Sequence, residues 1–212
     1  MSLFVTFEGP EGAGKSSVVR RLAAELTARG YAVVATREPG GTKIGEAIRQ
    51  ILLAPDHCGM LPQTEALLNT AARAQHVAEV IRPALAAGKI VLCDRYIDST
   101  LAYQGAGRGL DQEELLQLQR FATGGLWPDL TVLLDVPVEI GQARRRASGE
   151  PLSRFDADAL GFHERVRAGF LAAARSEPRR WRIIDATRGE EEVAQEALAV
   201  VLERLPPRPV RQ

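Results

Sequence analysis

The amino-acid sequence predicts one α/β domain built on a mainly parallel sheet of five strands. Segments with strand character alternate with segments of helical periodicity along the 212 residues, an order that favours parallel pairing. The strand segments are continuous apolar runs, as expected where helices cover both faces of a sheet. We find no internal repeat and no low-complexity linker, so residues 1–212 are expected to form a single domain.

Each expected element carries its own signal in the sequence. The strands are short apolar runs rich in β-formers, at residues 3–7, 31–36, 90–93, 130–136 and 181–185. The helices show helical periodicity, at residues 16–29, 44–53, 64–87, 98–103, 112–123, 138–147, 155–175 and 190–205. Pro83 is expected to kink the longest of these helices. Residues 206–212 carry no packing signal and are expected to form a flexible tail.

Charge and composition argue against several classes of protein. The 27 Lys and Arg residues balance 27 Asp and Glu residues, so a global electrostatic grip on nucleic acid or an acidic membrane is not indicated. No apolar run approaches the ~18 residues of a membrane span, and the N-terminus does not resemble a secretory signal. Cys58 and Cys93 lack the spacing of a metal site. We therefore expect a cytoplasmic protein.

A glycine-rich loop joins the first expected strand to the first expected helix. Gly9-Pro-Glu-Gly-Ala-Gly-Lys-Ser16 fits the phosphate-binding pattern GxxxxGK[ST] in the context that this pattern requires. Glycines let backbone N–H groups wrap phosphate oxygens, and the helix N-terminus adds positive potential. The expected nucleotide contacts in this loop are Gly9, Pro10, Glu11, Gly12, Ala13, Gly14, Lys15, Ser16 and Ser17.

Three residues of this loop are assigned chemistry of their own. Lys15 is expected to reach the β- and γ-phosphates of a nucleotide, and Ser16 to place its hydroxyl on Mg²⁺. Glu11 has two interpretations. It either orients a nucleotide or an arginine, or it is a solvated loop charge.

Three further features indicate phosphoryl transfer to a small acceptor. Asp94 and Arg95 follow a buried strand at the edge where open α/β sheets bind ligands, so Asp94 is expected near Mg²⁺ and Arg95 on an acceptor phosphate. A loop with two glycines and a proline, residues 37–42, follows another strand. Basic residues flank a polar loop at 144–154, which suits a lid that excludes water. Each feature also has a plainer interpretation. Asp94 and Arg95 would be a capping residue and part of a surface salt bridge, residues 37–42 an ordinary turn, and the basic residues at 144–154 a solvated face.

Taken together, these residues resemble the thymidylate kinase family from Phe4 to about Thr187. The signature stretches are Phe7-Glu-Gly-Pro-Glu-Gly-Ala-Gly-Lys-Ser-Ser17, Thr36-Arg-Glu-Pro-Gly-Gly-Thr42, Asp94-Arg-Tyr-Ile-Asp-Ser-Thr-Leu-Ala-Tyr-Gln-Gly105, Pro128-Asp-Leu-Thr131 and Ile184-Asp-Ala-Thr187. The resemblance implies a P-loop fold like that of nucleoside monophosphate kinases, with a lid. It also implies a homodimer that transfers a phosphoryl group from ATP to dTMP with Mg²⁺.

The resemblance assigns roles by position. Arg95 is expected to bind the dTMP phosphate, and Arg73 to contact the thymine and the phosphate region. Gln104 is expected to face the base, and Tyr103 to disfavour a ribose 2′-hydroxyl. The full set of implied acceptor contacts is Arg37, Pro39, Asn69, Arg73, Arg95, Ser99, Thr100, Tyr103 and Gln104.

The lid indicates a subtype of the family. Because the P-loop contains no arginine, the chain resembles bacterial members whose catalytic arginine lies in the lid, with Arg144, Arg146 and Arg154 as candidates. Arg144 is expected to contact the nucleotide. The expected catalytic set is Glu11, Lys15, Arg95, Arg146 and Arg154. One residue departs from the family pattern. Asn69 stands where a phenylalanine usually stacks on thymine, and Asn has no ring to stack.

Two other functions remain open at this point. Another small-molecule kinase, such as a deoxynucleoside kinase, would share the glycine-rich loop, although Arg73 and Arg95 favour an acceptor that already carries a phosphate. A nucleotide switch or a partner-driven ATPase usually has a carboxylate-rich Mg²⁺ strand or a clear switch loop, and only Asp94 suggests one here. Substrate profiling separates the first alternative, and ATP hydrolysis stimulated by a protein would indicate the second.

Overall fold

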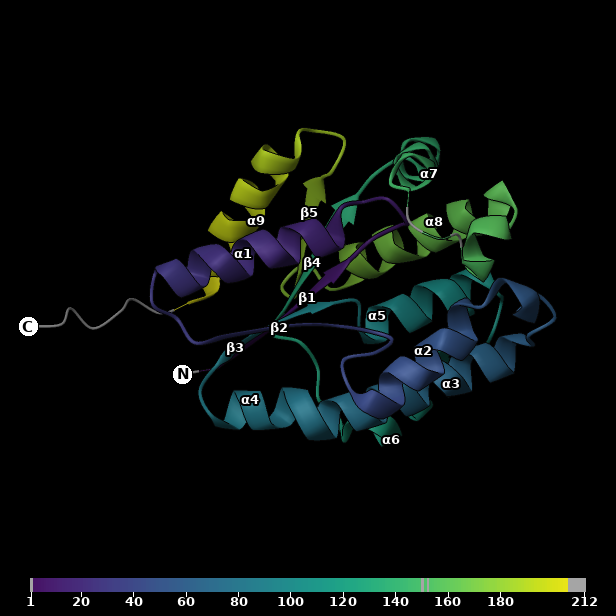
Figure 1. The fold of residues 1–212 in the computed structure, drawn as a ribbon, viewed down its shortest axis with the longest axis horizontal. Coiled ribbons are helices and arrows are strands. Elements are labelled where there is room, and N and C mark those ends of the chain that lie inside the picture. Colours follow the sequence, from purple (N-terminus) through teal and green to yellow (C-terminus); the bar gives the residue numbers. More distant parts are fainter. Residues whose placement is uncertain (1, 150, 152, 206–212) are drawn as a thin grey trace, which may run out of the picture.

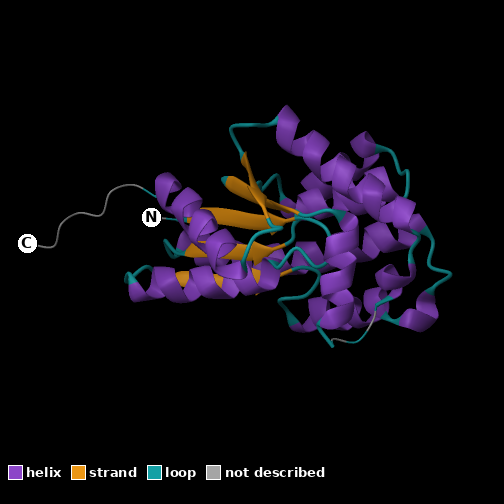
Figure 2. Cartoon of the chain, turned by 90° about the horizontal axis from the view of Figure 1, so that it is seen from above, coloured by secondary structure: helices purple, strands orange, loops and turns teal. Residues whose placement is uncertain are grey.

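A computed structural model describes residues 2–149, 151 and 153–205 of the chain. Within these residues one sheet of five parallel strands has the order β2-β3-β1-β4-β5 (Figures 1 and 2). The strands are β1 (Leu3–Glu8), β2 (Val33–Arg37), β3 (Ile90–Asp94), β4 (Leu130–Asp135) and β5 (Trp181–Asp185). The predicted α/β fold is confirmed. β1 is central, with β3 on one side and β4 on the other, so the carboxyl end of β1 is a switch point where such sheets bind ligands.

Helices cover both faces of the sheet. They are α1 (Lys15–Ala28), α2 (Lys43–Leu53), α3 (Pro62–His76), α4 (Arg82–Ala86), α5 (Ile97–Thr100), α6 (Gln112–Thr123), α7 (Val138–Ala147), α8 (Leu160–Ser176) and α9 (Glu190–Arg204). Two π-helical segments, Val77–Ile81 and Leu101–Gly107, continue α3 and α5, and short 3₁₀ turns lie at Pro55–His57 and Arg154–Ala157. None of the described helices is long and apolar enough to cross a bilayer.

The alternation of side chains along β1 separates two layers of core. α1 and α9 cover one face of the sheet, and α4 covers the other (Figure 1). Val5 and Phe7 pack on the first face, while Phe4 packs on the second, against α4 and the π-helical segment before it. Phe7 is fully buried and Phe4 is 1% exposed. Burying a side chain of this size contributes roughly 1.5–3 kcal/mol. Burial on both faces explains why the strands read as continuous apolar runs.

The expected kink at Pro83 takes the form of a π-helical turn. Pro83 has no N–H to donate to the preceding turn, and just before it the N–H of Arg82 bonds to the carbonyl of Val77, five residues back. The helix also begins at Pro62, two residues before the predicted start. The register therefore shifts around the proline and the helical path continues.

The helix expected over residues 155–175 is wrong in its first part. Arg154–Ala157 forms a 3₁₀ turn closed by a capping box between Ser153 and Asp156, and Asp158 is extended, with φ −65° and ψ 147°. The carboxylate of Asp158 binds both terminal nitrogens of Arg108, at 2.6 and 2.7 Å, which holds the chain out of the helix. α8 starts only at Leu160. Residues 150 and 152 of the expected lid and the expected tail at 206–212 lie outside the described residues.

Candidate active site

A cavity of about 740 Å³ opens at the carboxyl ends of the strands, a size within the usual range of ligand-binding cavities. The glycine-rich loop and the start of α1 line one end, and α3, α5 and the π-helical segment after α5 line the other. The cavity brings together these sequence-predicted residues: Glu11, Gly12, Ala13, Gly14, Lys15, Ser16, Ser17, Arg37, Pro39, Asn69, Arg73, Asp94, Arg95, Ser99, Thr100, Tyr103, Gln104 and Arg144.

Glycines allow the loop after β1 to pack closely against its surroundings. Gly9 has φ 142°, and a Cβ there would lie 2.3 Å from the carbonyl oxygen of Leu134 in β4. Gly12 has φ 70°, and a Cβ there would lie 2.0 Å from the carbonyl oxygen of Gly141 in α7. Neither position can accept a larger residue without a shift of backbone. The glycine-rich loop is therefore packed tightly between β4 and α7.

Lys15 is folded into its own loop. Its Nζ donates to the carbonyl oxygens of Gly9 at 3.1 Å and Pro10 at 2.7 Å, and the residue is 7% exposed. Burial and the positive charge of Arg95 lower the pKa of Lys15 to about 8, against the opposing effect of Glu11. Gly9 and Pro10 thus contribute carbonyl groups to the loop without lining the cavity. The ammonium is held where phosphate oxygens can replace these carbonyls.

Ser16 and Asp94 meet across the first turn of α1. The Ser16 hydroxyl donates to the Asp94 carboxylate, because the carboxyl end of β3 lies beside that of β1, where Phe7 pairs with Asp94. Among the described residues there is no group of three or more His, Cys, Asp or Glu side chains that could hold a metal ion. Mg²⁺ usually takes only one or two protein ligands and completes its shell with phosphate oxygens and water. The two oxygen donors fit that pattern.

Arg95 lies at the centre of the cavity. Its backbone has φ 70°, a conformation that costs a non-glycine residue of order 1 kcal/mol and aims the side chain back across the loop. Its guanidinium donates to the carbonyl of Gly9 at 3.1 Å, Ser99 Oγ at 3.0 Å, Glu11 at 2.9 Å and the Tyr103 hydroxyl at 2.9 Å. The strained backbone and four partners fix this cation between the two ends of the cavity.

Glu11 is an ion-pair partner in this structure. Its carboxylate accepts from Arg95, and from the Tyr103 hydroxyl at 3.0 Å. Burial raises the pKa of Glu11, but Arg95 and Lys15 outweigh burial and bring it down to about 2. Burial also raises the pKa of Tyr103 well above its usual value, so the phenol remains a donor. Of the two interpretations of Glu11, the geometry matches the one in which it orients an arginine.

Glu8 binds Ser99, one of the partners of Arg95, and the sequence reasoning did not identify it. It is fully buried at the end of β1 and accepts from the backbone N–H of Tyr96 at 2.8 Å. It also accepts from the N–H and the hydroxyl of Ser99, at 3.2 and 2.5 Å. Burial and the charge of Asp98 raise the pKa of Glu8 to about 7. A carboxylate at the last position of an apolar strand was the signal that could have identified it.

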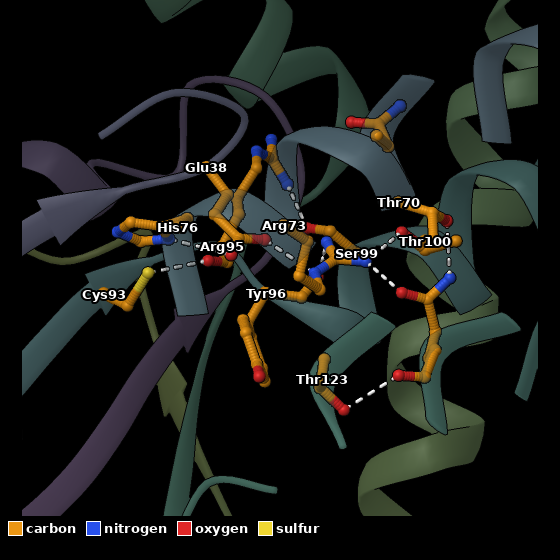
Figure 3. A network of polar contacts seen from close by, with 12 residues as sticks. Glu38, Thr70, Arg73, His76, Cys93, Arg95, Tyr96, Ser99, Thr100 and Thr123 are labelled. Carbon is orange, nitrogen blue, oxygen red and sulfur yellow. Dashed lines mark hydrogen bonds and ion pairs between the residues drawn. The ribbon is translucent and has the colours of Figure 1, made fainter. Parts of the chain in front are cut away.

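Arg73 anchors the far end of the cavity (Figure 3). Its Nε donates to Glu38 at 2.7 Å, Nη1 to Thr100 and Gln119 at 2.9 and 2.5 Å, and Nη2 to the carbonyl of Tyr96 at 2.8 Å. These bonds use four of its five N–H groups, and no other partner of Nη2 occurs in the described part of the chain. Arg73 is 2% exposed yet lines the cavity, so one N–H is left for a ligand.

Glu38 and His76 extend this network behind Arg73 (Figure 3). His76 Nδ1 lies 2.9 Å from the Glu38 carboxylate, and His76 Nε2 lies 2.6 Å from the hydroxyl of Thr36. All three residues come from β2, the loop after it and the end of α3, so they tie the second glycine-containing loop to the helix. The sequence reasoning did not single out Glu38 or His76, whose roles depend on contacts between distant segments.

Asn69 and Gln104 complete the same end of the cavity. The Asn69 amide donates to the carbonyl of Glu65 at 2.9 Å, one turn back along α3, so part of this side chain is bound to its own helix. Phe155 also lines this cavity and meets Tyr103 edge to face, with ring centroids 5.8 Å apart. The sequence reasoning did not identify Phe155, which adds an aromatic ring to the lining of the cavity.

Two arginines of α7 face the cavity. Arg144 donates to the carbonyls of Ala186 at 2.6 Å and Thr187 at 3.1 Å, which joins α7 to the loop after β5. Arg145 lines the cavity and pairs with Asp156 at 3.1 Å. The sequence reasoning passed over Arg145 although it lies between two candidates.

The other two lid candidates lie elsewhere. Arg146 is exposed and is not among the residues that line the cavity. Arg154 is buried outside the cavity, where it pairs with Glu65 at 2.6 Å and donates to the carbonyl of Leu52 at 3.2 Å. Its Nη2 is buried without a partner among the described residues. The structure therefore does not bring Arg146 or Arg154 to the end of the cavity that the glycine-rich loop lines.

Arg49 is one more cation that the sequence reasoning did not name. It extends from α2 into the cavity and donates to the carbonyl of Pro39 at 3.0 Å. Burial and the nearby charge of Arg37 lower its pKa. Its neighbour Arg37 is exposed and pairs with Glu46 at 2.9 Å. The sequence feature that could have identified Arg49 is its place as a cation in the helix directly after the second glycine-containing loop.

Comparison with known proteins gives a consistent result over nearly the whole chain. The family described as thymidylate kinase matches residues 7–197. Proteins named thymidylate kinase from Thermomicrobium roseum and Geotalea uraniireducens are 61% and 50% identical, over 96% and 97% of this chain and 96% and 99% of their own length. A thymidylate kinase crystal structure from Ehrlichia chaffeensis superposes with a TM-score of 0.76 at 35% identity, covering 94% of this chain and 98% of that one. The chain belongs to the thymidylate kinase family of phosphotransferases.

Proposed function

We propose that this chain phosphorylates dTMP to dTDP, with ATP as donor and Mg²⁺ as cofactor, by direct in-line transfer. The observation that carries the proposal is the single cavity that joins the phosphate-binding loop and Lys15 to a second set of cations and carboxamides at the far end. A donor phosphate in the loop and an acceptor nucleotide at Arg73 and Gln104 would place their phosphates on either side of Arg95. The end with the phosphate-binding loop thus takes the donor, and the far end takes the acceptor.

At the donor end the loop supplies backbone N–H groups and the ammonium of Lys15. The Lys15 Nζ exchanges the carbonyls of Gly9 and Pro10 for phosphate oxygens, and the α1 N-terminus adds its positive potential. Ser16 and Asp94 would hold Mg²⁺, which supplies charge neutralisation for the transferring phosphoryl group. These groups orient the γ-phosphate toward Arg95.

At the acceptor end the dTMP phosphate itself is the nucleophile. A phosphate oxygen of dTMP attacks the γ-phosphorus, the bond to the β–γ bridging oxygen breaks, and ADP leaves with that electron pair. A phosphate oxygen near neutral pH is already anionic, so no strong general base is required. The positive charge of Arg95 offsets the repulsion between the negative acceptor phosphate and the negative donor phosphate, and so holds the acceptor phosphate in place.

Lid closure would exclude water, which otherwise competes for the phosphoryl group. Arg144 and Arg145 already line the cavity and are placed to contact the donor. For Arg146 or Arg154 to serve the transferring phosphate, as the family resemblance implies, the lid must move relative to this structure. In the case of Arg154 that movement would break its pair with Glu65.

A steady-state coupled assay of ADP release tests the proposal. ATP and Mg²⁺ are supplied with dTMP, dUMP, UMP, CMP or thymidine as acceptor. Strong preference for dTMP is expected. Preference for another monophosphate would retain the kinase chemistry and overturn the substrate, and activity on thymidine alone would indicate a nucleoside kinase. ADP release that no acceptor stimulates would overturn the kinase proposal.

The proposal includes a cytoplasmic homodimer, as the family resemblance implies. Two large apolar side chains, Leu67 on α3 and Phe121 on α6, are 54% and 89% exposed on helices that contact each other. Exposed groups of this size on adjoining helices suit a contact with a second copy. Sedimentation equilibrium is expected to give twice the mass of the 23.0 kDa chain, and Phe121→Glu is expected to favour monomer.

A further inference from the structure

A buried carboxylate lies directly behind the far end of the cavity. Glu65 on α3 is fully buried, and its carboxylate meets three side chains from other elements. Oε2 accepts from Arg154 at 2.6 Å and from Arg108 at 3.2 Å. Oε1 accepts from Gln104 Nε2 at 2.5 Å and from Arg108 Nε at 3.4 Å. Two guanidinium groups compensate the charge, which makes Glu65 an acceptor for all three neighbours.

This acceptor dictates how the Gln104 carboxamide is turned. A carboxylate can only accept, so the NH₂ group of Gln104 must face Glu65 and the carbonyl oxygen must face away from it. That oxygen accepts no hydrogen bond from any described residue. It is also not one of the side-chain polar atoms that are fully buried without a hydrogen-bond partner. Because Gln104 lines the cavity, its free polar atom on that side is an acceptor.

The arginines that flank Glu65 are themselves held on several sides. Arg108 is paired with both oxygens of Asp158 and lies over the ring of Phe162, 4.1 Å from its centroid. Arg154 lies over the ring of Phe155 at 4.4 Å. The carboxylate therefore sits in a frame built from α3, the segment after α5 and the segment before α8. Such a frame keeps Glu65, and through it Gln104, in one orientation.

We propose that Glu65 is a positioning residue that determines which base the cavity accepts. By turning the Gln104 oxygen toward the cavity, Glu65 offers an acceptor to the N3–H of thymine or uracil. Cytosine presents a lone pair at N3, so an acceptor opposite it leaves two acceptors face to face. The inference rests on the proposed function, because it needs the acceptor base at this end of the cavity. It assigns base selection to a side chain that does not line the cavity.

The variant Glu65→Gln tests this orientation. The amide oxygen of the new side chain is expected to stay with Arg154 and Arg108, which are donors only, so its NH₂ group would face Gln104. Gln104 would then turn its oxygen toward position 65 and its NH₂ toward the cavity. We expect kcat/KM for dTMP to fall roughly 10- to 100-fold. The ratio of dTMP to dCMP turnover is expected to fall by at least about tenfold, while the ratio of dTMP to dUMP stays unchanged because both bases carry N3–H.

Glu79→Gln is the matched control. Glu79 lies beyond the same helix, is exposed, and also accepts from a glutamine carboxamide, that of Gln75. It lies outside the cavity, so both ratios should equal those of the unmodified chain. A dTMP-to-dCMP ratio in Glu65→Gln that equals this control, with a folded protein by circular dichroism, overturns the proposal. Failure of the unmodified chain to prefer dTMP would instead overturn the proposed function, so the two failures are distinguishable.

A second measurement uses the unmodified chain and does not depend on the folding of a variant. Glutamine side chains are labelled with ¹⁵N, and the Gln104 NH₂ signal is assigned by its absence in Gln104→Leu. Because this group faces a buried carboxylate, its protons are expected to exchange slowly with water before dTMP is added, and saturating dTMP should not change that rate. Fast exchange in the free protein that becomes slow on binding dTMP would show the NH₂ group facing the ligand and would overturn the proposal.

Discussion

The two ends of the cavity are built in different ways. At the end lined by the glycine-rich loop, which we call the phosphate end after the proposed function, consecutive residues 11–17 line the cavity. At the far end, which we call the base end because the acceptor base is proposed to bind there, single side chains come from separate elements, such as Arg73 from α3, Thr100 from α5 and Gln104 from the segment after it. One end is a local structure, and the other exists only after the chain has folded.

The difference also shows in the electrostatics. At the phosphate end Lys15, Arg95 and Glu11 are close enough to move one another's pKa values. At the base end Arg73 has its charge compensated by Glu38 and its donors used by neutral groups, an arrangement that fixes geometry. Changes at the phosphate end should therefore affect turnover, and changes at the base end should affect the choice and affinity of the acceptor.

The largest effect is expected for Lys15→Ala. The variant removes the ammonium that we propose contacts the transferring phosphoryl group, so kcat is expected to fall roughly a thousandfold or more, with little change in dTMP affinity. Lys43→Ala is the control, because Lys43 is an exposed lysine at the start of α2 that does not line the cavity. Steady-state kinetics measure both. Near-normal kcat in Lys15→Ala would contradict the donor assignment.

Arg95→Ala probes the boundary between the two ends. Loss of the proposed charge-assisted contact to the acceptor phosphate, worth about 1.5–3 kcal/mol, should raise the KM for dTMP roughly 10- to 100-fold and leave the KM for ATP nearly unchanged. Arg29→Ala serves as control, since Arg29 forms an exposed pair with Glu25 and neither residue lines the cavity. If the KM for ATP alone rises in Arg95→Ala, then Arg95 belongs to the donor end.

Gly141→Ala tests whether the phosphate end depends on close packing with α7. A Cβ at Gly141 would lie 2.3 Å from the carbonyl oxygen of Glu11, so the loop or the helix must shift. We expect kcat to fall about 10- to 50-fold in a protein that still folds. Gly161→Ala is the matched control, because that helical glycine has only the end of the Arg165 side chain nearby, at 3.7 Å. Equal kinetics in the two variants would show that the loop tolerates displacement.

The pH dependence of ATP use provides a smaller test at the same end. Burial and Arg95 bring the pKa of Lys15 to about 8, so the free enzyme carries this charge below pH 8 and loses it as the pH rises. The phosphates of ATP are ionised throughout this range. We therefore expect kcat/KM for ATP to fall about five- to sixfold between pH 8 and pH 9. Thermal unfolding at each pH checks that the protein stays folded, and a flat profile to pH 9.5 would contradict the shifted pKa.

The contrast between the two ends also explains what the sequence could predict. The phosphate end could be predicted because Gly9, Gly12, Lys15 and Ser16 lie within one short motif whose chemistry is carried by neighbours in sequence. The sheet followed for a similar reason, since apolar runs and intervening helices are local signals. These features need no knowledge of how distant segments meet.

The supporting residues of the base end could not be predicted in that way. Glu65, Glu38 and His76 act through partners 35 or more residues away, and a single sequence does not show these pairs. The expected lid shows the same limit. Arg154 was predicted beside the phosphate from its basic neighbourhood, but Glu65 and Leu52 hold it elsewhere in this structure. The helix expected at 155–175 is interrupted because a distant arginine, Arg108, binds Asp158.

The smallest expected effect concerns Asn69, at the base end. Asn69→Phe would place a ring where the family usually stacks one on thymine, and stacking is worth about 1–3 kcal/mol where it has been measured on nucleic-acid-binding proteins. Part of this gain is offset, because Asn69 loses its bond to the carbonyl of Glu65 and Phe155 already supplies an aromatic ring to the cavity. We expect the KM for dTMP to fall about fivefold with kcat unchanged. Asn69→Leu separates the ring from added apolar bulk, and an equal fall in both variants would show that stacking is not the cause.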